Sequence, residues 1–198
     1  MNQLREEYQK EREDVHVSDL LLCIREQVFR KLYPKPIDDK ELSFYAIGEG
    51  AHLALQRLAD EGGAVSEKEV SLDGIIGTVD IYDGVPIEIK TTRSKDATPR
   101  PFHVKQLSYY MALTGANVGI LLYLMINDFE DPFRFRTITL NDNELAGLRK
   151  ELKDKAELFT KALHLRDPFA APHVKHDEEL GWKCNRCKYR ETCYSRPD

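Results

Sequence analysis

Residues 69–92, EVSLDGIIGTVDIYDGVPIEIKTT, have the apolar alternation of two or three β-strands, and charged side chains stand at fixed positions within them. Glu88 and Lys90 are two residues apart, so on a strand both side chains project from the same face. The opposite face consists of apolar residues that can be buried: Val85, Ile87 and Ile89. We therefore expect a carboxylate and an ammonium group to share one exposed face of a strand.

Asp80 lies on the preceding strand, and the Asp83-Gly84 pair between the two strands predicts a hairpin. A strict two-residue loop would pair Asp80 with Ile87 and turn its carboxylate away from Glu88. A three-residue loop with Gly84 in the left-handed region, or a β-bulge, would bring both carboxylates to one face. We therefore predict an irregular connection at this hairpin.

Two carboxylates and a lysine in this order suit the hydrolysis of a phosphodiester. Asp80 and Glu88 could hold Mn²⁺ or Mg²⁺, which neutralises charge at the phosphate and activates water at neutral pH. Lys90 could orient that water or stabilise the developing charge. The alternative is an exposed hairpin whose Glu88 and Lys90 form an ordinary surface pair.

Length and composition indicate one folded unit. The chain has 198 residues, of which 41% are hydrophobic, enough for one domain with a small appendage. No apolar run approaches the roughly 20 residues of a membrane span, and the first residues are charged, unlike a signal peptide. These features predict a soluble, cytoplasmic protein with no membrane partner.

The net charge of −5 argues mildly against binding to nucleic acid, but the basic residues are clustered. One cluster follows Lys90, and a second extends from Lys183 to Arg196. Both adjoin candidate sites, so both could follow a phosphate backbone. The candidate DNA-binding residues of the first cluster are Arg93, Lys95, Arg100 and Lys105.

Hydrophobic spacing and capping signals predict the remaining elements. The expected elements are a Ser18-capped helix to residue 33, a helix over 42–58, a helix over 102–114 that ends at Gly115, a buried strand over 119–126, a more exposed strand over 133–140, and a long helix opened by Asn141 and Glu144. A loop over 94–101 would lie beside the strand that carries Lys90. Beyond Pro168 the tail is loop-like and rich in cysteine.

The chain has four cysteines, and three of them stand in the tail with C-x₂-C-x₅-C spacing. Disulfides are disfavoured inside cells, so this spacing suggests thiolates that converge on a metal. Zinc in a four-cysteine site is possible, but one remote ligand plus a group of three suits an iron–sulfur cluster. The candidate ligands are Cys23, Cys184, Cys187 and Cys193. Either metal would join the tail to the first helix.

Three further polar residues on predicted helices could belong to the site. His52 follows Gly48 and Gly50, which permit a close approach of its helix to the strands, although most helical histidines are packed or on the surface. Gln106 and Tyr110 share one face of their helix and can bind phosphate or water, although they could be ordinary helix residues.

Together these residues resemble the motifs of the RecB-like branch of the PD-(D/E)xK nucleases, and specifically the CRISPR iron–sulfur exonucleases, the fourth Cas family. The resemblance covers nearly the whole chain: Cys23, G-x-x-x-H at residues 48–52, Asp80, E-x-K at residues 88–90, Q-x-x-x-Y at residues 106–110, and the three tail cysteines. Val79 stands where the family's motif has proline, a position that supports geometry rather than chemistry.

The resemblance implies an α/β fold of the restriction-endonuclease type, with a mixed central sheet flanked by helices. It implies an N-terminal helical segment over residues 1–33, a nuclease core over 34–166 and a cysteine-rich segment over 167–198. It further implies a metal site formed by His52, Asp80, Glu88 and the carbonyl of Ile89, catalysis assisted by Lys90, Gln106 and Tyr110, and an iron–sulfur cluster, 4Fe–4S or alternatively 2Fe–2S.

The implied activity is Mn²⁺- or Mg²⁺-dependent cleavage of single-stranded DNA ends, which would trim DNA for CRISPR spacer acquisition beside the integrase proteins. A homo-oligomer is compatible with this reading. The alternatives are a related iron–sulfur nuclease of repair or recombination, a non-catalytic DNA-binding scaffold, and a zinc-stabilised interaction domain. The last would leave Asp80, Glu88 and Lys90 unexplained.

Overall fold

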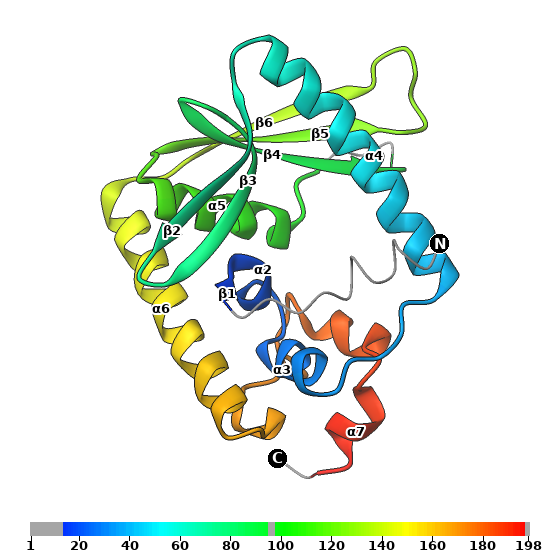
Figure 1. The fold of residues 1–198 in the computed structure, drawn as a ribbon, viewed down its shortest axis with the longest axis vertical. Coiled ribbons are helices and arrows are strands. Elements are labelled where there is room, and N and C mark those ends of the chain that lie inside the picture. Colours follow the sequence, from blue (N-terminus) through cyan, green and yellow to red (C-terminus); the bar gives the residue numbers. More distant parts are fainter. Residues whose placement is uncertain (1–13, 95–97, 197–198) are drawn as a thin grey trace.

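A computed structural model describes residues 14–94 and 98–196, in which six strands form one mixed sheet (Figure 1). The sheet order is β1-β3-β4-β5-β6, with β2 paired to β3 outside this path. The strands are β1 (Val15–His16), β2 (Val65–Leu72), β3 (Ile75–Asp83), β4 (Val85–Thr92), β5 (Val118–Met125) and β6 (Phe133–Thr139). Residues 69–92, for which two or three strands were expected, belong to three strands, β2, β3 and β4. The bounds of β5 and β6 lie within one residue of those predicted.

Helices flank this sheet and continue into a helical lower half. The helical elements are α2 (Val17–Leu20), α3 (Ile24–Leu32), α4 (Asp39–Glu61), α5 (Pro101–Thr114), α6 (Asp142–His164), the 3₁₀ helices η1 (Pro168–Ala170) and η2 (Gly181–Arg186), and α7 (Arg190–Tyr194). In Figure 1, α5, α2 and α3 are stacked below the sheet, whereas α4 runs diagonally past β4 and β5. The expected mixed sheet flanked by helices is confirmed.

The main core lies between the sheet and the helices α2, α3, α5 and α6. Its fully buried side chains include Leu20, Val28, Leu107, Met111 and Phe159. A smaller cluster lies under α4, where Ile81, Ile89 and Leu122 pack against Leu55 and Ala59. The charged positions of β4 alternate with residues of this smaller cluster, so they face the α5 side of the sheet.

The β4-α5-β5 segment is a crossover that places two strands parallel. Lys90 pairs in register with Tyr123, and Glu88 with Leu121. Parallel strands need such a connection, and α5 supplies it between Arg100 and the left-handed Gly115, whose φ is 74°. The predicted C-cap at Gly115 is confirmed. The crossover decides which residues of β5 lie beside Lys90.

The N-terminal helix differs from its prediction. Two short helices replace the single Ser18-capped helix, because Cys23 has an extended backbone, with φ −88° and ψ 108°, and is the N-cap of α3. The cap of α2 is His16, whose backbone N–H donates to Asp19, while Ser18 lies inside the helix. Leu20 and Ile24 keep helical spacing across the break, so periodicity alone did not reveal it.

Two long helices are capped by reciprocal bonds. Asn141 and Glu144 form the predicted capping box of α6. Asp38 and Glu41 form another at the start of α4, which therefore begins before the expected residue 42 and continues past 58 to Glu61. Within the described residues, no helix is long and apolar enough to cross a membrane.

Candidate active site and cysteine pocket

The candidate active site lies where β3 and β4 diverge. Their ladder pairs Asp83 with Val85 and Ile81 with Ile87, around Gly84 at φ 69°. The connection is therefore the predicted irregular one, and the same register continues to Asp80 opposite Glu88. The ladder ends before this pair. Instead, the Oδ2 atom of Asp80 accepts a hydrogen bond of 2.7 Å from the backbone N–H of Ile89. The Asp80 carboxylate therefore lies between the two strands where they separate, and we call this place, with Asp80, Glu88 and Ile89, the fork.

Lys90 and His52 each hold one carboxylate of this fork. Lys90 Nζ forms an ion pair with Glu88 Oε1 on the same strand. From α4, the Nδ1 atom of His52 lies 3.4 Å from Oδ1 of Asp80. The α4 helix thus places His52 beside Asp80, and its role as a metal ligand stays a prediction. Residues from α4, β3 and β4 thus converge within a single cluster.

Glu88 is buried, which corrects the expectation of an exposed Glu88–Lys90 face. Only 1% of Glu88 is accessible to solvent, because α5 packs over β4 and places Tyr110 near this carboxylate. Its Oε2 atom has no hydrogen-bond partner within the described structure. A buried carboxylate oxygen without a partner is costly unless a cation binds there. The chemistry of this site therefore fits a divalent metal.

The electrostatics of the cluster follow from this burial. Loss of solvent raises the pKa of Glu88 to about 7; Lys90 opposes this shift and the neighbouring Asp80 adds to it. Burial alone would lower the pKa of Lys90, but Glu88 and Asp80 raise it above its ordinary value. Burial likewise opposes protonation of His52, yet the hydrogen bond and charge of Asp80 raise its pKa. All three groups therefore keep a proton to a higher pH than their ordinary counterparts do.

Gln106 and Tyr110 lie on the α5 side of the cluster, as their shared helix face predicted. The Nε2 atom of Gln106 donates to the Tyr110 hydroxyl over 3.1 Å. Burial, with the charge of Glu88 next in size, raises the pKa of Tyr110. The ring reaches this position because Gly77 on β3 lacks a side chain: a Cβ there would lie 2.9 Å from the ring. Gly77 thus permits the contact of α5 with β3.

No preformed metal cage accompanies these contacts. Within residues 14–94 and 98–196, no group of three or more His, Cys, Asp or Glu side chains is already arranged to hold an ion. At the fork, Lys90 and His52 contact carboxylate oxygens that a metal would use. Binding would require these contacts to loosen. The role of the Ile89 carbonyl stays a prediction.

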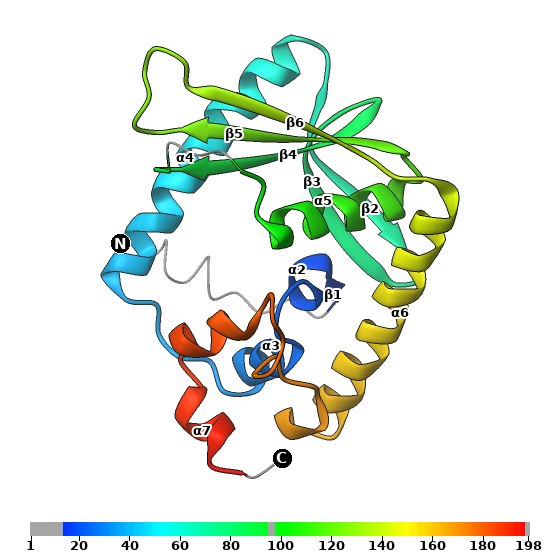
Figure 2. The same ribbon diagram turned by 180° about the vertical axis from the view of Figure 1, so that it is seen from behind.

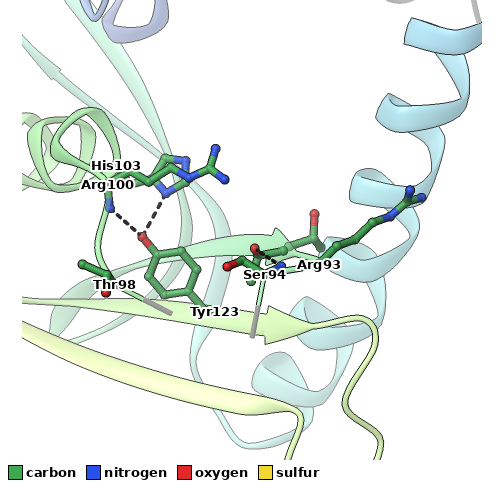
Figure 3. Close-up of a pocket in the computed structure, with 8 residues that line it drawn as sticks. Arg93, Ser94, Thr98, Arg100, His103 and Tyr123 are labelled. Carbon is green, nitrogen blue, oxygen red and sulfur yellow. Dashed lines mark hydrogen bonds between the residues drawn. The ribbon is translucent and has the colours of Figure 1, made fainter. Parts of the chain in front are cut away.

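The three candidate DNA-binding residues that the structure describes do not form one group. Arg93 and Arg100 line one cavity of about 380 Å³ beside the end of β4, shown in Figure 3. Lys105 instead forms an ion pair of 2.8 Å with Glu151 on α6, so it braces two helices. Lys95 lies outside the described residues.

The sequence interpretation missed Tyr123, and it assigned no role to His103. The Tyr123 hydroxyl lies 2.9 Å from Nδ1 of His103 and accepts a 3.3 Å bond from the Arg100 backbone N–H (Figure 3). Burial and the charges of Lys90 and Arg100 lower the pKa of His103 to about 3, so its ring is neutral at pH 7. Tyr123 sits in a continuous apolar run, and only the parallel register places it beside Lys90.

The four cysteines line a single pocket between α3 and the tail, two segments that lie together in Figures 1 and 2. All four are free thiols. The predicted convergence of Cys23 with Cys184, Cys187 and Cys193 is thus present in the pocket lining. Arg25 strengthens the junction, because its Nε donates to the carbonyl of Ala171 over 2.9 Å.

The donor set of this pocket fits a soft metal centre. Burial raises the pKa of the Cys23 thiol to about 11 and also raises that of Cys187. Buried thiols remain protonated unless a metal supplies compensating charge. Glu26, missed by sequence interpretation, also lines the pocket; it is 4% exposed, and its Oε2 lies 3.7 Å from Lys183. Four thiols suit either an iron–sulfur cluster or a zinc ion.

Comparison with known proteins decides the family. Residues 4–194 match the PD-(D/E)XK nuclease superfamily. The chain belongs to the PD-(D/E)XK nuclease superfamily. It is 30% identical over 201 residues to the CRISPR-associated exonuclease Cas4 of Saccharolobus solfataricus, and the match covers 93% of this chain and 89% of the relative. The resemblance noted from the motifs is confirmed.

Solved structures agree with this PD-(D/E)XK assignment at the level of the fold. The crystal structure of SSO0001 is 22% identical with a TM-score of 0.64, covering 100% of this chain and 95% of that one. LHK-Exo in complex with dAMP is 19% identical with a TM-score of 0.55, covering 77% and 90%. PD-(D/E)XK nucleases use divalent metals, and the fork of β3 and β4, with its buried Glu88 carboxylate, has the chemistry to bind such an ion.

Proposed function

We propose that this PD-(D/E)XK protein is a metal-dependent deoxyribonuclease that acts at the ends of single-stranded DNA. The observation that carries the proposal is the fork of β3 and β4, where the orphaned Oε2 of Glu88 faces the charge of Asp80. A cation would relieve both the unsatisfied oxygen and the repulsion of the carboxylates. The relationship to the exonuclease Cas4 supports the choice of DNA ends.

Asp80, Glu88 and His52, with the Ile89 carbonyl, would hold the Mn²⁺ or Mg²⁺ ion. When bound, that ion supplies charge neutralisation at the phosphate and activation of the attacking water. The protein residues position the reactants. The N–H of Ile89 keeps Asp80 in the fork, and Lys90, released from Glu88, can donate to the water or to a phosphate oxygen.

Gln106 and Tyr110 complete the substrate side. Their mutual hydrogen bond orients both groups toward the face that carries Glu88. Because the Tyr110 hydroxyl stays protonated, it can donate to a phosphate oxygen while Gln106 donates through its amide. These contacts bind and orient the strand without taking part in proton transfer.

The cysteine pocket would hold an iron–sulfur cluster, 4Fe–4S by our proposal, with 2Fe–2S and zinc as its rivals. Four free thiols that line one pocket support a four-thiolate centre. When bound, the cluster ties the tail to α3. The relationship to Cas4 further supports a role in trimming DNA for CRISPR spacer acquisition with integrase partners. A homo-oligomer is compatible with this role.

End-labelled single-stranded DNA, incubated with the protein and either Mn²⁺ or Mg²⁺, tests the activity. We expect progressive shortening of linear strands and no cleavage of a circular single strand, because an exonuclease requires an end. A chelator should stop the reaction. Cleavage of the circle at the linear rate would show an endonuclease, and intact linear DNA with both metals would refute the proposal.

A further inference from the structure

Arg100 separates two cavities of similar size. It lines the cavity described above, together with Arg93, His103 and Tyr123, and it also lines a second cavity of about 380 Å³. The second cavity is formed by the first residues of α5 and by the cysteine-rich tail. Its lining residues are Arg100, Pro101, Phe102, Glu179, Leu180, Trp182 and Arg186. One arginine thus joins the surface beside Lys90 to a surface of the tail.

The first cavity has the chemistry of a phosphate and sugar site. Five of its eight lining residues carry hydroxyl groups and two are arginines, and Tyr123 places it directly beside Lys90 in the sheet register. In Figure 3, Tyr123, His103 and Arg100 gather on one side; Arg93 lies on the other, and its side chain is directed toward α4, where its guanidinium lies 5.6 Å from the Phe44 ring. Its volume is in the range of small-molecule sites, enough for a nucleotide unit.

The second cavity has an aromatic wall instead. The rings of Phe102 and Trp182 have centroids 5.8 Å apart and are tilted by 42°, and Trp182 is 41% exposed. Phe102 also contacts the ring of His103, with centroids 4.3 Å apart. Arg186 adds a cation to this wall. Exposed aromatic rings beside arginines are the usual platform for unpaired bases.

We propose that the two cavities form one path for single-stranded DNA, in which Arg100 and the first cavity bind phosphates and a base stacks on Trp182. This inference rests on the proposed nuclease function and extends it to the tail. A single strand fits because its bases are free to stack, whereas a duplex buries them. The cysteine-rich segment would thereby present Trp182 to the strand that enters the active site.

The fluorescence of Trp182 tests this path directly, because the chain contains a single tryptophan. An oligothymidylate of about fifteen nucleotides is added to the Glu88→Ala protein, which we expect to bind DNA without cutting it. Stacking should quench the emission with the same midpoint as binding measured by anisotropy. An abasic strand of equal length should bind through phosphates without comparable quenching. Binding without any quenching by oligothymidylate would overturn the stacking contact.

Variants on the same background separate the two halves of the path. Trp182→Ala should weaken binding about 5-fold to 100-fold, and Trp182→Phe should restore most of it. Arg100→Gln should weaken binding and reduce the salt dependence by about one phosphate contact. Phe129→Ala and Arg166→Gln are matched controls: Phe129 is 91% exposed, Arg166 is exposed, and neither lines a cavity described above.

The outcomes distinguish this inference from the proposed function. If the unmodified protein shortens single strands but Trp182→Ala binds within twofold of its parent, the path is wrong and the nuclease proposal stands. If quenching and the loss with Trp182→Ala occur but no strand is shortened with Mn²⁺ or Mg²⁺, the path stands and the nuclease proposal falls. Equal affinity and quenching with duplex DNA would overturn the assignment to single strands. Visible absorbance of Trp182→Phe checks that the cysteine pocket is intact.

Discussion

The fork of β3 and β4 and the cysteine pocket each contain a buried glutamate, yet their surroundings differ. Glu88 and Glu26 both pair one oxygen with a cation, Lys90 and Arg30 respectively, and the Oε2 of each lacks a hydrogen-bond partner. Glu88 faces a second carboxylate, Asp80, whereas Glu26 has a second cation, Lys183, within 3.7 Å. The fork therefore brings two carboxylates together, whereas Glu26 in the cysteine pocket is held by two cations.

The two regions also differ in what holds them. Paired strands and a backbone N–H fix the fork, so its geometry depends on the sheet. The cysteine pocket joins Cys23 to a tail of 3₁₀ turns and one short helix, in which few residues are buried. Tyr189 is an exception, stacked on Phe29 with ring centroids 5.1 Å apart. We infer that a metal matters for chemistry at the fork and for structure in the pocket.

The sharpest test of this contrast is Glu88→Ala. Loss of the buried carboxylate should lower the cleavage rate by about a thousandfold or more, because the metal loses a charged oxygen ligand. Visible absorbance should persist. Rates with labelled single-stranded DNA are compared with those of Glu69→Ala, an exposed residue of β2. A rate within a few-fold of the parent would place the metal elsewhere.

Lys90→Ala should have a smaller effect on the same reaction. A positioned donor contributes about a hundredfold to ten thousandfold, and the metal ligands would remain. The pKa of Glu88 should also rise further, since Lys90 opposes its protonation. Cleavage rates and metal affinity are measured together. A bleached protein would contradict the independence of the two centres.

Metal affinity at the fork should increase about tenfold between pH 6 and pH 8. Glu88 has a pKa of about 7, so about a tenth of it is ionised at pH 6 and most of it at pH 8. The stability of the metal-free protein should change in the opposite direction and decrease as the pH rises. The raised pKa of Glu88 stabilises the fold fully below about pH 4.5, and this contribution is lost as the pH rises through 7. Calorimetric titration with Mn²⁺ and melting curves without metal check both. A pH-independent affinity would contradict the raised pKa.

Of these variants, Cys187→Ser should change the cleavage rate least and the stability of the tail most. Loss of one thiolate should weaken the metal centre, abolish a brown colour and lower the melting temperature by roughly 10 °C, because metal-binding energy stabilises the fold. Cleavage at 25 °C should fall only several-fold, through loosened bracing of α3. Elemental analysis of the parent distinguishes iron from zinc. Full colour and stability in the variant would refute the four-cysteine centre.

The sequence by itself determined the candidate residues of both regions. Strand alternation placed Glu88 and Lys90 on one face, the Asp83-Gly84 turn required an irregular hairpin, and the tail spacing identified the thiols. These are local patterns, set by the period of a strand or by a few residues of a turn, so they can be recognised before folding is known.

Only the tertiary structure decided the environment of those residues. The burial of Glu88, the position of Tyr123 beside Lys90, the break at Cys23, and the meeting of Trp182 with Phe102 all depend on segments distant in the chain. Solvent exclusion and parallel register arise when α5 crosses over the sheet and the tail packs beside α3. The pKa values of these groups follow from that packing, because burial and nearby charges shift them. The sequence therefore identified the groups, and the fold determined their protonation.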